Sequence, residues 1–408
     1  MRQRPFPSWP VHDQREQELI AQVVAGGQWG LGGHRQGEFA DKFADYLGGK
    51  YGFCVSNGTV SLEIALKALG IGAGDEVIVP MLTWIADASA VLAVGAVPVL
   101  VDVDLETWCI DPEAVEQAHT PRTRAVIAVH LYGSLADLDR LTQITHRQGI
   151  ALVEDCAHTH GSRWRNWPAG SVGAIGSFSF QQSKPLAAGE GGFLITDRAD
   201  LAARIAPLMN CGRPWEGRAA GPLLGSNYRM TEFQAAILLA QLERLDDQIE
   251  TRARNARYLD EQLGALAGIL PQRRPAGVTR QSYYRYAFRF DRSEFGGVHR
   301  NVFLEAIRAE GIPAEPPYSM IVHHQAFVVD PCWNPQITDG GALGSIPCPV
   351  SERLSTEGVA LPQELLLGTR EDMDDIVAAI TKIKENSARL CTLRNRLRTL
   401  KADWFGKG

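Results

Sequence analysis

The sequence lacks the features that mark several large classes of proteins. No run of apolar residues is long enough to cross a bilayer, and residues 1–5 do not resemble the start of a signal peptide. Basic residues are not in excess, since the formal net charge is -6, whereas binding to nucleic-acid phosphates needs a basic surface. We therefore expect a cytoplasmic protein with neither a membrane partner nor a nucleic-acid partner.

Paired cysteines and repeats are missing as well. The 7 cysteines are scattered, and none of them stands in a CxxC pair or at a zinc-binding spacing. We expect free, mostly buried thiols in a reducing compartment, and no metal site. No internal repeat is visible, and 408 residues are enough for two domains with a core each.

Short apolar runs alternate with helical patterns between residues 51 and 196. Most of these runs are apolar throughout, which is typical of strands covered on both faces in a mainly parallel sheet. Helical patterns such as Ser61–Leu69 and Leu138–Arg147 lie between them. The alternation predicts a doubly wound α/β domain. The predicted strands are Gly52–Val55, Glu76–Pro80, Val99–Val103, Ala125–His130, Ala151–Glu154, Ser177–Phe180 and Gly192–Thr196.

The pattern changes after residue 230. Apolar residues recur at helical spacing from 231 to 266, which predicts one long helix. A strand is predicted at Tyr283–Phe290, and helices are predicted at Arg300–Glu310, Asp372–Glu385 and, with basic side chains, Ala388–Lys401. These elements indicate a smaller α+β domain.

The two patterns divide the chain into two predicted domains. Residues 1–245 are expected to form an extended, proline-containing arm and the large domain with its mainly parallel sheet. Residues 246–408 are expected to form the smaller C-terminal domain, with a linking helix and a basic helical tail.

One lysine stands in unusual company. Lys184 lies between the apolar run Ser177–Phe180 and a glycine-rich turn, among small and hydroxyl-bearing residues and far from other cations in the sequence. Burial lowers the pKa of a lysine and frees its lone pair, so an amine in such a segment suits a cofactor that carries an aldehyde. A solvated lysine on a surface turn is the alternative, and this segment alone does not separate the two.

Two other segments place suitable groups where predicted strands end. Gly58 and Thr59 lie at a strand-to-helix turn, where free N–H groups and a hydroxyl can bind an anion. Ordinary capping of the helix explains the same residues. Trp84 follows the strand that ends at Pro80, and it can either stack on a planar ring or pack in the core.

Two acids end the apolar strand that begins at Ala151. A carboxylate in that position needs a partner, and the protonated nitrogen of a pyridine ring is one; for Asp155, capping of a helix is the competing interpretation. His158 can orient this carboxylate or contact the ring, and Ser179 can close the pocket. An anion site, a stacking face, an acid and an amine are together what pyridoxal 5′-phosphate (PLP) needs.

The ordered set of motifs resembles the DegT/DnrJ/StrS family of PLP-dependent aminotransferases over nearly the whole chain. These are fold-type I enzymes that act on nucleotide keto-sugars and keto-cyclitols. The resemblance implies a PLP-binding large domain and a homodimer with shared active sites. The matching motifs are Ser56–Thr59, Thr83–Trp84, Val129–Gly133, Glu154–His158, Ser177–Gly192 and Asn227–Met230.

The resemblance also implies a role for each matching residue. Lys184 corresponds to the Schiff-base lysine, which also moves the proton, and Asp155 to the partner of the ring nitrogen. His158 stands where many members have Gln, and Asn227 matches a residue that reaches the phosphate in the neighbouring subunit. Members that dehydrate sugars carry His in place of the lysine, so Lys184 favours transamination. The implied cofactor contacts are Gly58, Thr59, Trp84, Asp155, His158, Ser179, Lys184 and Asn227.

A narrower resemblance concerns the substrates. Val278–Tyr284, Phe295–Gly297 and Pro349–Arg353 are similar to segments of glutamine-dependent aminotransferases of scyllo-inosose and 2-deoxy-scyllo-inosose, which serve aminocyclitol antibiotic pathways. L-Glutamine is therefore the expected donor and a keto-cyclitol the expected acceptor. A nucleotide keto-sugar is an alternative, as is the reaction of 3-amino-5-hydroxybenzoate synthase, which Asn210–Pro214 resembles. A non-catalytic PLP-binding protein is the remaining hypothesis.

Contacts with the substrates are harder to predict. Arg229 suits the α-carboxylate of the donor, because a guanidinium binds a carboxylate through two hydrogen bonds. Tyr283 and His323 are further candidates, although each of the three could equally pack in the core or lie on the surface. Pro185, directly after Lys184, stands where many relatives have a larger residue, and the sequence does not explain it.

Overall fold

A seven-stranded sheet forms the centre of the computed structural model, which describes residues 2, 4–214, 223–320 and 347–390. The strand order is β1-β9-β8-β5-β4-β2-β3, and within this sheet only β9 runs against its neighbours. The predicted α/β fold class is therefore confirmed, although β3 begins two residues earlier than expected. The strands are β1 (Tyr51–Val55), β2 (Glu76–Pro80), β3 (Val97–Val101), β4 (Thr123–Val129), β5 (Ala151–Asp155), β8 (Ile175–Ser179) and β9 (Gly192–Thr196).

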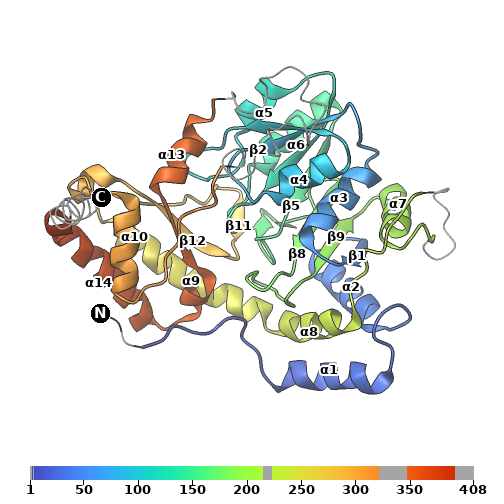
Figure 1. The fold of residues 1–408 in the computed structure, drawn as a ribbon, viewed down its shortest axis with the longest axis horizontal. Helices are drawn as coiled ribbons and strands as arrows, with labels where there is room; N and C mark the ends of the chain where they lie inside the picture. The colour runs from blue at the N-terminus through green and yellow to red at the C-terminus, as the bar shows by residue number, and fades with distance from the viewer. Residues whose placement is uncertain (1, 3, 215–222, 321–346, 391–408) are drawn as a thin grey trace, which may run out of the picture.

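Helices cover both faces of this sheet (Figure 1). Successive residues of β4 alternate between two buried apolar clusters: Val126 and Ala128 belong to one, Ile127 and Val129 to the other. This is why the central residues of β4 are apolar without alternation. One cluster includes α3 (Gly58–Ala68), α4 (Ala86–Ala93) and α7 (Ala199–Met209), and the other includes α1 (Gln14–Gly26), α2 (Arg35–Tyr46), α5 (Pro112–Ala118), α6 (Leu138–Gln148) and α8 (Glu232–Glu243).

A third core lies in the C-terminal part of the chain, at the left of Figure 1. The sheet β10-β12-β13 is antiparallel, and four phenylalanines, Phe288, Phe290, Phe295 and Phe303, pack against one another beside it. The elements are α9 (Leu245–Gly264), β10 (Ile269–Pro271), β12 (Arg285–Phe290), α10 (Arg300–Ala309), α13 (Pro349–Glu357), β13 (Gly358–Pro362) and α14 (Arg370–Glu385). A small sheet of β6 (Arg163–Trp164), β7 (Trp167–Pro168) and β11 (Val278–Arg280) and two short 3-10 helices, Arg292–Phe295 and Gln363–Leu367, complete the described elements.

The prediction of one long helix across 231–266 is wrong. The structure has two helices there, α8 and α9, which meet at Arg244 with φ -109° and ψ 0°. The apolar periodicity continues through the junction, because Leu242 is partly buried and Leu245 fully buried in the same cluster. Periodicity reports which side chains are buried, and it does not detect a single residue between them that leaves helical geometry.

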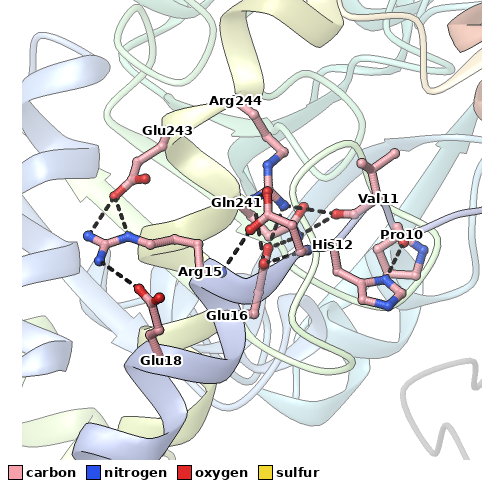
Figure 2. A network of polar contacts seen from close by, with 10 residues as sticks. Pro10, Val11, His12, Arg15, Glu16, Glu18, Gln241, Glu243 and Arg244 are labelled. Atoms are coloured by element: carbon pink, nitrogen blue, oxygen red, sulfur yellow. Dashed lines mark hydrogen bonds and ion pairs between the residues drawn. The ribbon is translucent and has the colours of Figure 1, made fainter.

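Side-chain contacts at this junction connect it to the start of α1 (Figure 2). Arg244 and Gln241 both donate to the Val11 carbonyl oxygen, at 3.0 and 2.8 Å, and both donate to the carboxylate of Glu16. Arg244 also donates to Asp13, the residue that caps α1, at 2.9 Å. The junction therefore holds the first turn of α1 against the large sheet's helical layer.

The N-terminal arm is extended, as predicted, and no helix or strand precedes α1 among its described residues. Arg2 forms an ion pair with Asp372 of α14 at 2.6 Å, and the Trp9 indole donates to the carbonyl oxygen of Gln182 at 2.9 Å. The arm thus runs from the C-terminal part of the molecule to the large sheet, passing below α9 in Figure 1 before it turns down to α1. No helix of the described residues is long and apolar enough to cross a membrane. Most of the predicted basic tail lies outside those residues.

Candidate active site

A cavity of about 660 Å³ lies where β1, β2, β5 and β8 end. Parallel strands present their carboxyl ends at one edge of the sheet, which is where α/β proteins bind ligands. Seven of the eight cofactor contacts predicted from the sequence line this cavity, and Asn227 does not. The seven are Gly58, Thr59, Trp84, Asp155, His158, Ser179 and Lys184.

The start of α3 forms one end of the cavity. Asn57 caps the helix by accepting from the N–H of Val60 at 2.9 Å, and the first backbone N–H to bond back is that of Ser61, to the Asn57 carbonyl oxygen. The preceding N–H groups of Gly58 and Thr59 therefore point beyond the helix start, as in an anion-binding site. A Cβ on Gly58 would lie 2.7 Å from the Cβ of Ser179, so only glycine allows the two to close this end.

Lys184 lies opposite, in the turn after β8. Its residue is only 9% exposed, and Nζ lies 4.6 Å from the centre of the Tyr284 ring. The Tyr284 hydroxyl and Ser183 Oγ are 2.9 Å apart, which holds the ring against this turn. Lys184 is therefore buried beside an aromatic face, and it is not the solvated lysine of a surface turn that the sequence left open.

The two acids at the end of β5 point to opposite faces of the sheet. Asp155 lines the cavity and also accepts from the Ala157 N–H at 2.8 Å. Among the described residues no helix follows β5 before β6, so this bond closes a turn, and the interpretation of Asp155 as a helix cap is wrong. Glu154 is fully buried on the other face, where it accepts from the N–H groups of Gly170, Val172 and Gly173 and from His130. Burial opposes its ionisation, but these donors lower the pKa of Glu154.

The neighbourhood of Glu154 also groups His130 and Cys156 closely enough to bind a metal ion. His130 Nδ1 accepts from the Ala136 N–H at 3.2 Å, so its other nitrogen carries the proton and donates to Glu154 at 3.0 Å. Burial raises the pKa of the Cys156 thiol well above its usual value. The ligand atoms are thus engaged within the protein, and the cluster fixes the end of β5.

His158 is held as a neutral ring. It stacks on Tyr284 with 4.2 Å between ring centres and 12° between planes. Burial and the nearby Lys184 lower the pKa of His158 well below its usual value. Nδ1 accepts from the Tyr132 N–H at 3.3 Å, so the proton lies on Nε2, which faces the Tyr318 hydroxyl at 3.4 Å.

Three residues predicted from the sequence do not line the cavity, and a fourth cannot be placed in it or outside it. Tyr283 is buried in the core of the C-terminal part. Arg229 donates to Asn210 at 2.8 Å and, like the exposed Asn227, does not line the cavity of its own chain. His323 lies outside the described residues.

Two cavity-side residues escaped the sequence analysis. Tyr318 lines the cavity from the segment before residue 321, and its ring centre lies 5.5 Å from that of Trp84. Asp87 is fully buried in α4, and the hydroxyl of Thr83, which lines the cavity, donates to it at 2.8 Å. An acid inside an otherwise apolar helical run was the available signal for Asp87, whereas the sequence around Tyr318 gives none.

The fold and these residues define a class of enzyme. A cavity at the carboxyl edge of a mainly parallel sheet offers a helix start for a phosphate, an amine, an acid and aromatic faces, and this fits PLP in a fold-type I transferase. The family model of the DegT/DnrJ/EryC1/StrS aminotransferases matches residues 10–381. The chain belongs to this family, whose aminotransferases use PLP.

Known proteins resemble the chain over nearly its full length. The L-glutamine:2-deoxy-scyllo-inosose aminotransferase of Streptomyces fradiae is 42% identical to it, over 96% of this chain and 97% of the relative. The L-glutamine:scyllo-inosose aminotransferase of Streptomyces griseus is 40% identical, over 94% and 95%. The crystal structure of 3-amino-5-hydroxybenzoic acid synthase matches with a TM-score of 0.83 and 34% identity, over 93% of this chain and 98% of that one.

Proposed function

We propose that this enzyme transfers the amino group of L-glutamine to a keto-cyclitol such as scyllo-inosose or 2-deoxy-scyllo-inosose. The observation that carries the proposal is that Lys184 and Asp155 line the same cavity, together with the start of α3. The substrate class is supported by relatives of 40% and 42% identity whose names include these two ketones. In the reaction, L-glutamine becomes its 2-keto acid, and the carbonyl carbon of the cyclitol receives the amino group.

PLP supplies, when bound, an aldehyde that reacts with amines and a ring that accepts an electron pair. Lys184 Nζ is the amine for this aldehyde and afterwards the base and acid that moves the proton at the reacting carbon. Asp155 binds the ring nitrogen and keeps it protonated. The N–H groups at the start of α3, with Thr59 and Ser179, hold the phosphate.

The aromatic side chains have separate tasks in this proposal. Trp84 offers its face to the ring, and the residue is 54% exposed in the single chain. His158 and Tyr284 form a stacked pair beside Lys184, which keeps water away from the amine. His158 stays neutral, so it is not a second cation that competes with the ring nitrogen for Asp155.

We further propose a homodimer in which Asn227 completes the phosphate site of the partner subunit. Asn227 is exposed and lies outside the cavity of its own chain. Large apolar side chains are exposed at Trp29, Leu31 and Leu224, at 54%, 60% and 97%. Exposed apolar groups of this size are typical of surfaces that a partner covers.

The test is a two-stage assay of the purified enzyme. The protein should show the visible absorption of bound PLP, and L-glutamine alone should remove that absorption. A ketone panel containing scyllo-inosose, 2-deoxy-scyllo-inosose and a nucleotide 4-keto-sugar then identifies the acceptor. Lys184→Ala should lose both stages, and amino transfer by that variant would contradict the proposal.

A second candidate is the formation of an aminohydroxybenzoate, because 3-amino-5-hydroxybenzoic acid synthase shares 34% of its sequence and the fold. The same ketone panel separates the two candidates. If L-glutamine removes the absorption of PLP but no ketone takes up the amino group, the aromatic product becomes the favoured one.

A further inference from the structure

Asp87 occupies an unusual position beside the cavity. It lies in the first turn of α4 and is 0% exposed. One of its oxygens, Oδ2, accepts from Thr83 at 2.8 Å, while Oδ1 is buried without a hydrogen-bond partner among the described residues. A buried carboxylate oxygen with no donor costs free energy, so its state needs an explanation.

Asp155, at the end of β5, is the neighbouring acid that acts on Asp87. Burial and this neighbouring carboxylate raise the pKa of Asp87 well above its usual value, and the Thr83 hydroxyl and Lys184 oppose the shift. Two neighbouring carboxyl groups in a desolvated site favour holding one proton between them, because like charges there repel. Asp155 lines the cavity and accepts from a backbone N–H, so it is the better site for the charge.

We propose that Asp87 is a neutral acid that donates its Oδ1 proton to Asp155 and so positions that carboxylate for the ring nitrogen of PLP. This assignment gives the unpartnered oxygen a partner, since a protonated Oδ1 donates where an ionised one cannot. Asp87 is a positioning residue, because it acts through Asp155. The inference rests on the role of Asp155 in the proposed function.

Two substitutions separate a neutral donor from a charged carboxylate. Asp87→Asn retains both hydrogen bonds of the proposed neutral acid, since its amide oxygen accepts from Thr83 and its NH₂ donates to Asp155. Asp87→Leu has a similar volume and offers neither bond. Asp111→Asn is the matched control, because Asp111 caps the remote helix α5 and asparagine caps equally well.

The first readout is the dissociation constant of PLP. Asp87→Asn and Asp111→Asn should bind PLP within about threefold of the wild type, whereas Asp87→Leu should bind about tenfold or more weakly, because a hydrogen bond to a charged group is lost. Equal weakening in Asp87→Asn and Asp87→Leu would show that the negative charge is needed and would overturn the proposal. Unchanged binding by a folded Asp87→Leu would overturn it too.

The second readout needs neither cofactor nor substrate, and it decides the question if Asp87→Leu does not fold. An acid whose pKa is raised by folding makes the native state less stable as the pH rises above its unfolded pKa of about 4. The melting temperature of cofactor-free Asp87→Asn, measured relative to that of the wild type at the same pH, should therefore rise from pH 4 upwards. A difference in melting temperature between the two proteins that stays constant from pH 4 to pH 8 would overturn the proposal. Failure of the aminotransferase assay alone would leave this result unaffected, so the two failures can be told apart.

Discussion

Tyr284 lies close to two cations, Lys184 and Arg285. Its ring lies 4.6 Å from the amine of Lys184 and 5.1 Å from the guanidinium carbon of Arg285. Burial alone would raise the pKa of this phenol, but the two cations and hydrogen bonds to its hydroxyl lower it to about 8. Tyr286, two residues on in β12, shows the opposite case, since burial and Asp260 raise its pKa.

The Tyr284→Phe variant tests this charge balance. The pKa of Tyr284 is about 10 in the unfolded chain and about 8 in the folded one, so between these pH values the unfolded state binds more protons. The wild type should therefore gain stability over Tyr284→Phe as the pH rises from about 8 to about 10. Below that window both states hold the proton and the gap should stay constant.

Urea unfolding over a series of pH values measures this gap. Tyr286→Phe is the control, because a raised pKa cannot make the wild type more stable in the same window. If both variants gave the same pH dependence, the phenol of Tyr284 would not be the group that titrates.

Single residues were predictable where the chain's local pattern reveals their position. Asp155 ends the buried strand β5, while Gly58 and Lys184 come shortly after the strands β1 and β8, and parallel strands end at one edge of the sheet. Tyr318 enters the cavity from the C-terminal part of the chain, and no local pattern reports a contact over that distance. Asp87 was missed because the apolar run around it predicts only a buried helix.

At the scale of elements, the junction between α8 and α9 connects the first turn of α1 to the rest of the fold (Figure 2). Glu16 is buried there and accepts from both Arg244 and Gln241. Burial alone would raise the pKa of Glu16, but the Arg244 guanidinium and the Asp13 N–H lower it. The carboxylate therefore depends on Arg244 for its charge.

Arg244→Met should destabilise the protein by about 1–3 kcal/mol, because a buried charged acceptor loses its main donor. The control is Arg254→Met in α9, an exposed arginine whose side chain donates to Thr251 and to no other residue in the described part of the chain. It should cost less than about 0.5 kcal/mol. Urea unfolding at pH 7 measures both.

The pH dependence of the Arg244→Met effect is a second check. A carboxylate with a lowered pKa stabilises the fold above its unfolded pKa, and this contribution is lost as the pH falls through the folded pKa. The difference between wild type and Arg244→Met should therefore shrink below about pH 4. A difference that persists unchanged in acid would point to lost packing in place of the ion pair.

Secondary-structure elements were predicted best where both their faces are buried. β2 and β9 have the predicted bounds, because uninterrupted apolar strands are bounded by polar turns. The break at Arg244 was not predicted, since a basic residue is an ordinary member of a helix and its partners on α1 lie more than 200 positions away.

At the scale of the whole molecule, the proposed dimer can be tested by complementation between two variant chains. If Asn227 serves the partner's phosphate site, a Lys184→Ala chain and an Asn227→Ala chain complement each other. One site of each mixed dimer then has both residues, and the other has neither.

An equal mixture of these two inactive variants, unfolded and refolded together, should recover about a quarter of the wild-type activity, because half of the dimers are mixed and each has one intact site. The separately refolded variants, combined afterwards without exchange of subunits, are the control. No recovery in a mixture shown to contain mixed dimers would mean that Asn227 acts within its own chain or outside the site.

The overall class of the fold follows from alternating apolar strands and helices, and it was predictable for that reason. The path of the N-terminal arm was not, because its proline residues indicate only an extended segment. Its ends are fixed by Arg2 on α14 and by Trp9 at Gln182, and both contacts join segments far apart in the sequence.

The four donors around Glu154 also bear on how this family can diversify. They hold the end of β5 from the face that no substrate reaches, so the neighbouring carboxylate keeps its place whatever happens at the mouth of the cavity. Substitutions at Tyr318, which lines the cavity from another segment, can reshape the cavity without removing these donors. Under the proposed function, residues that contact the acceptor can therefore vary without loss of the acid that binds the ring nitrogen.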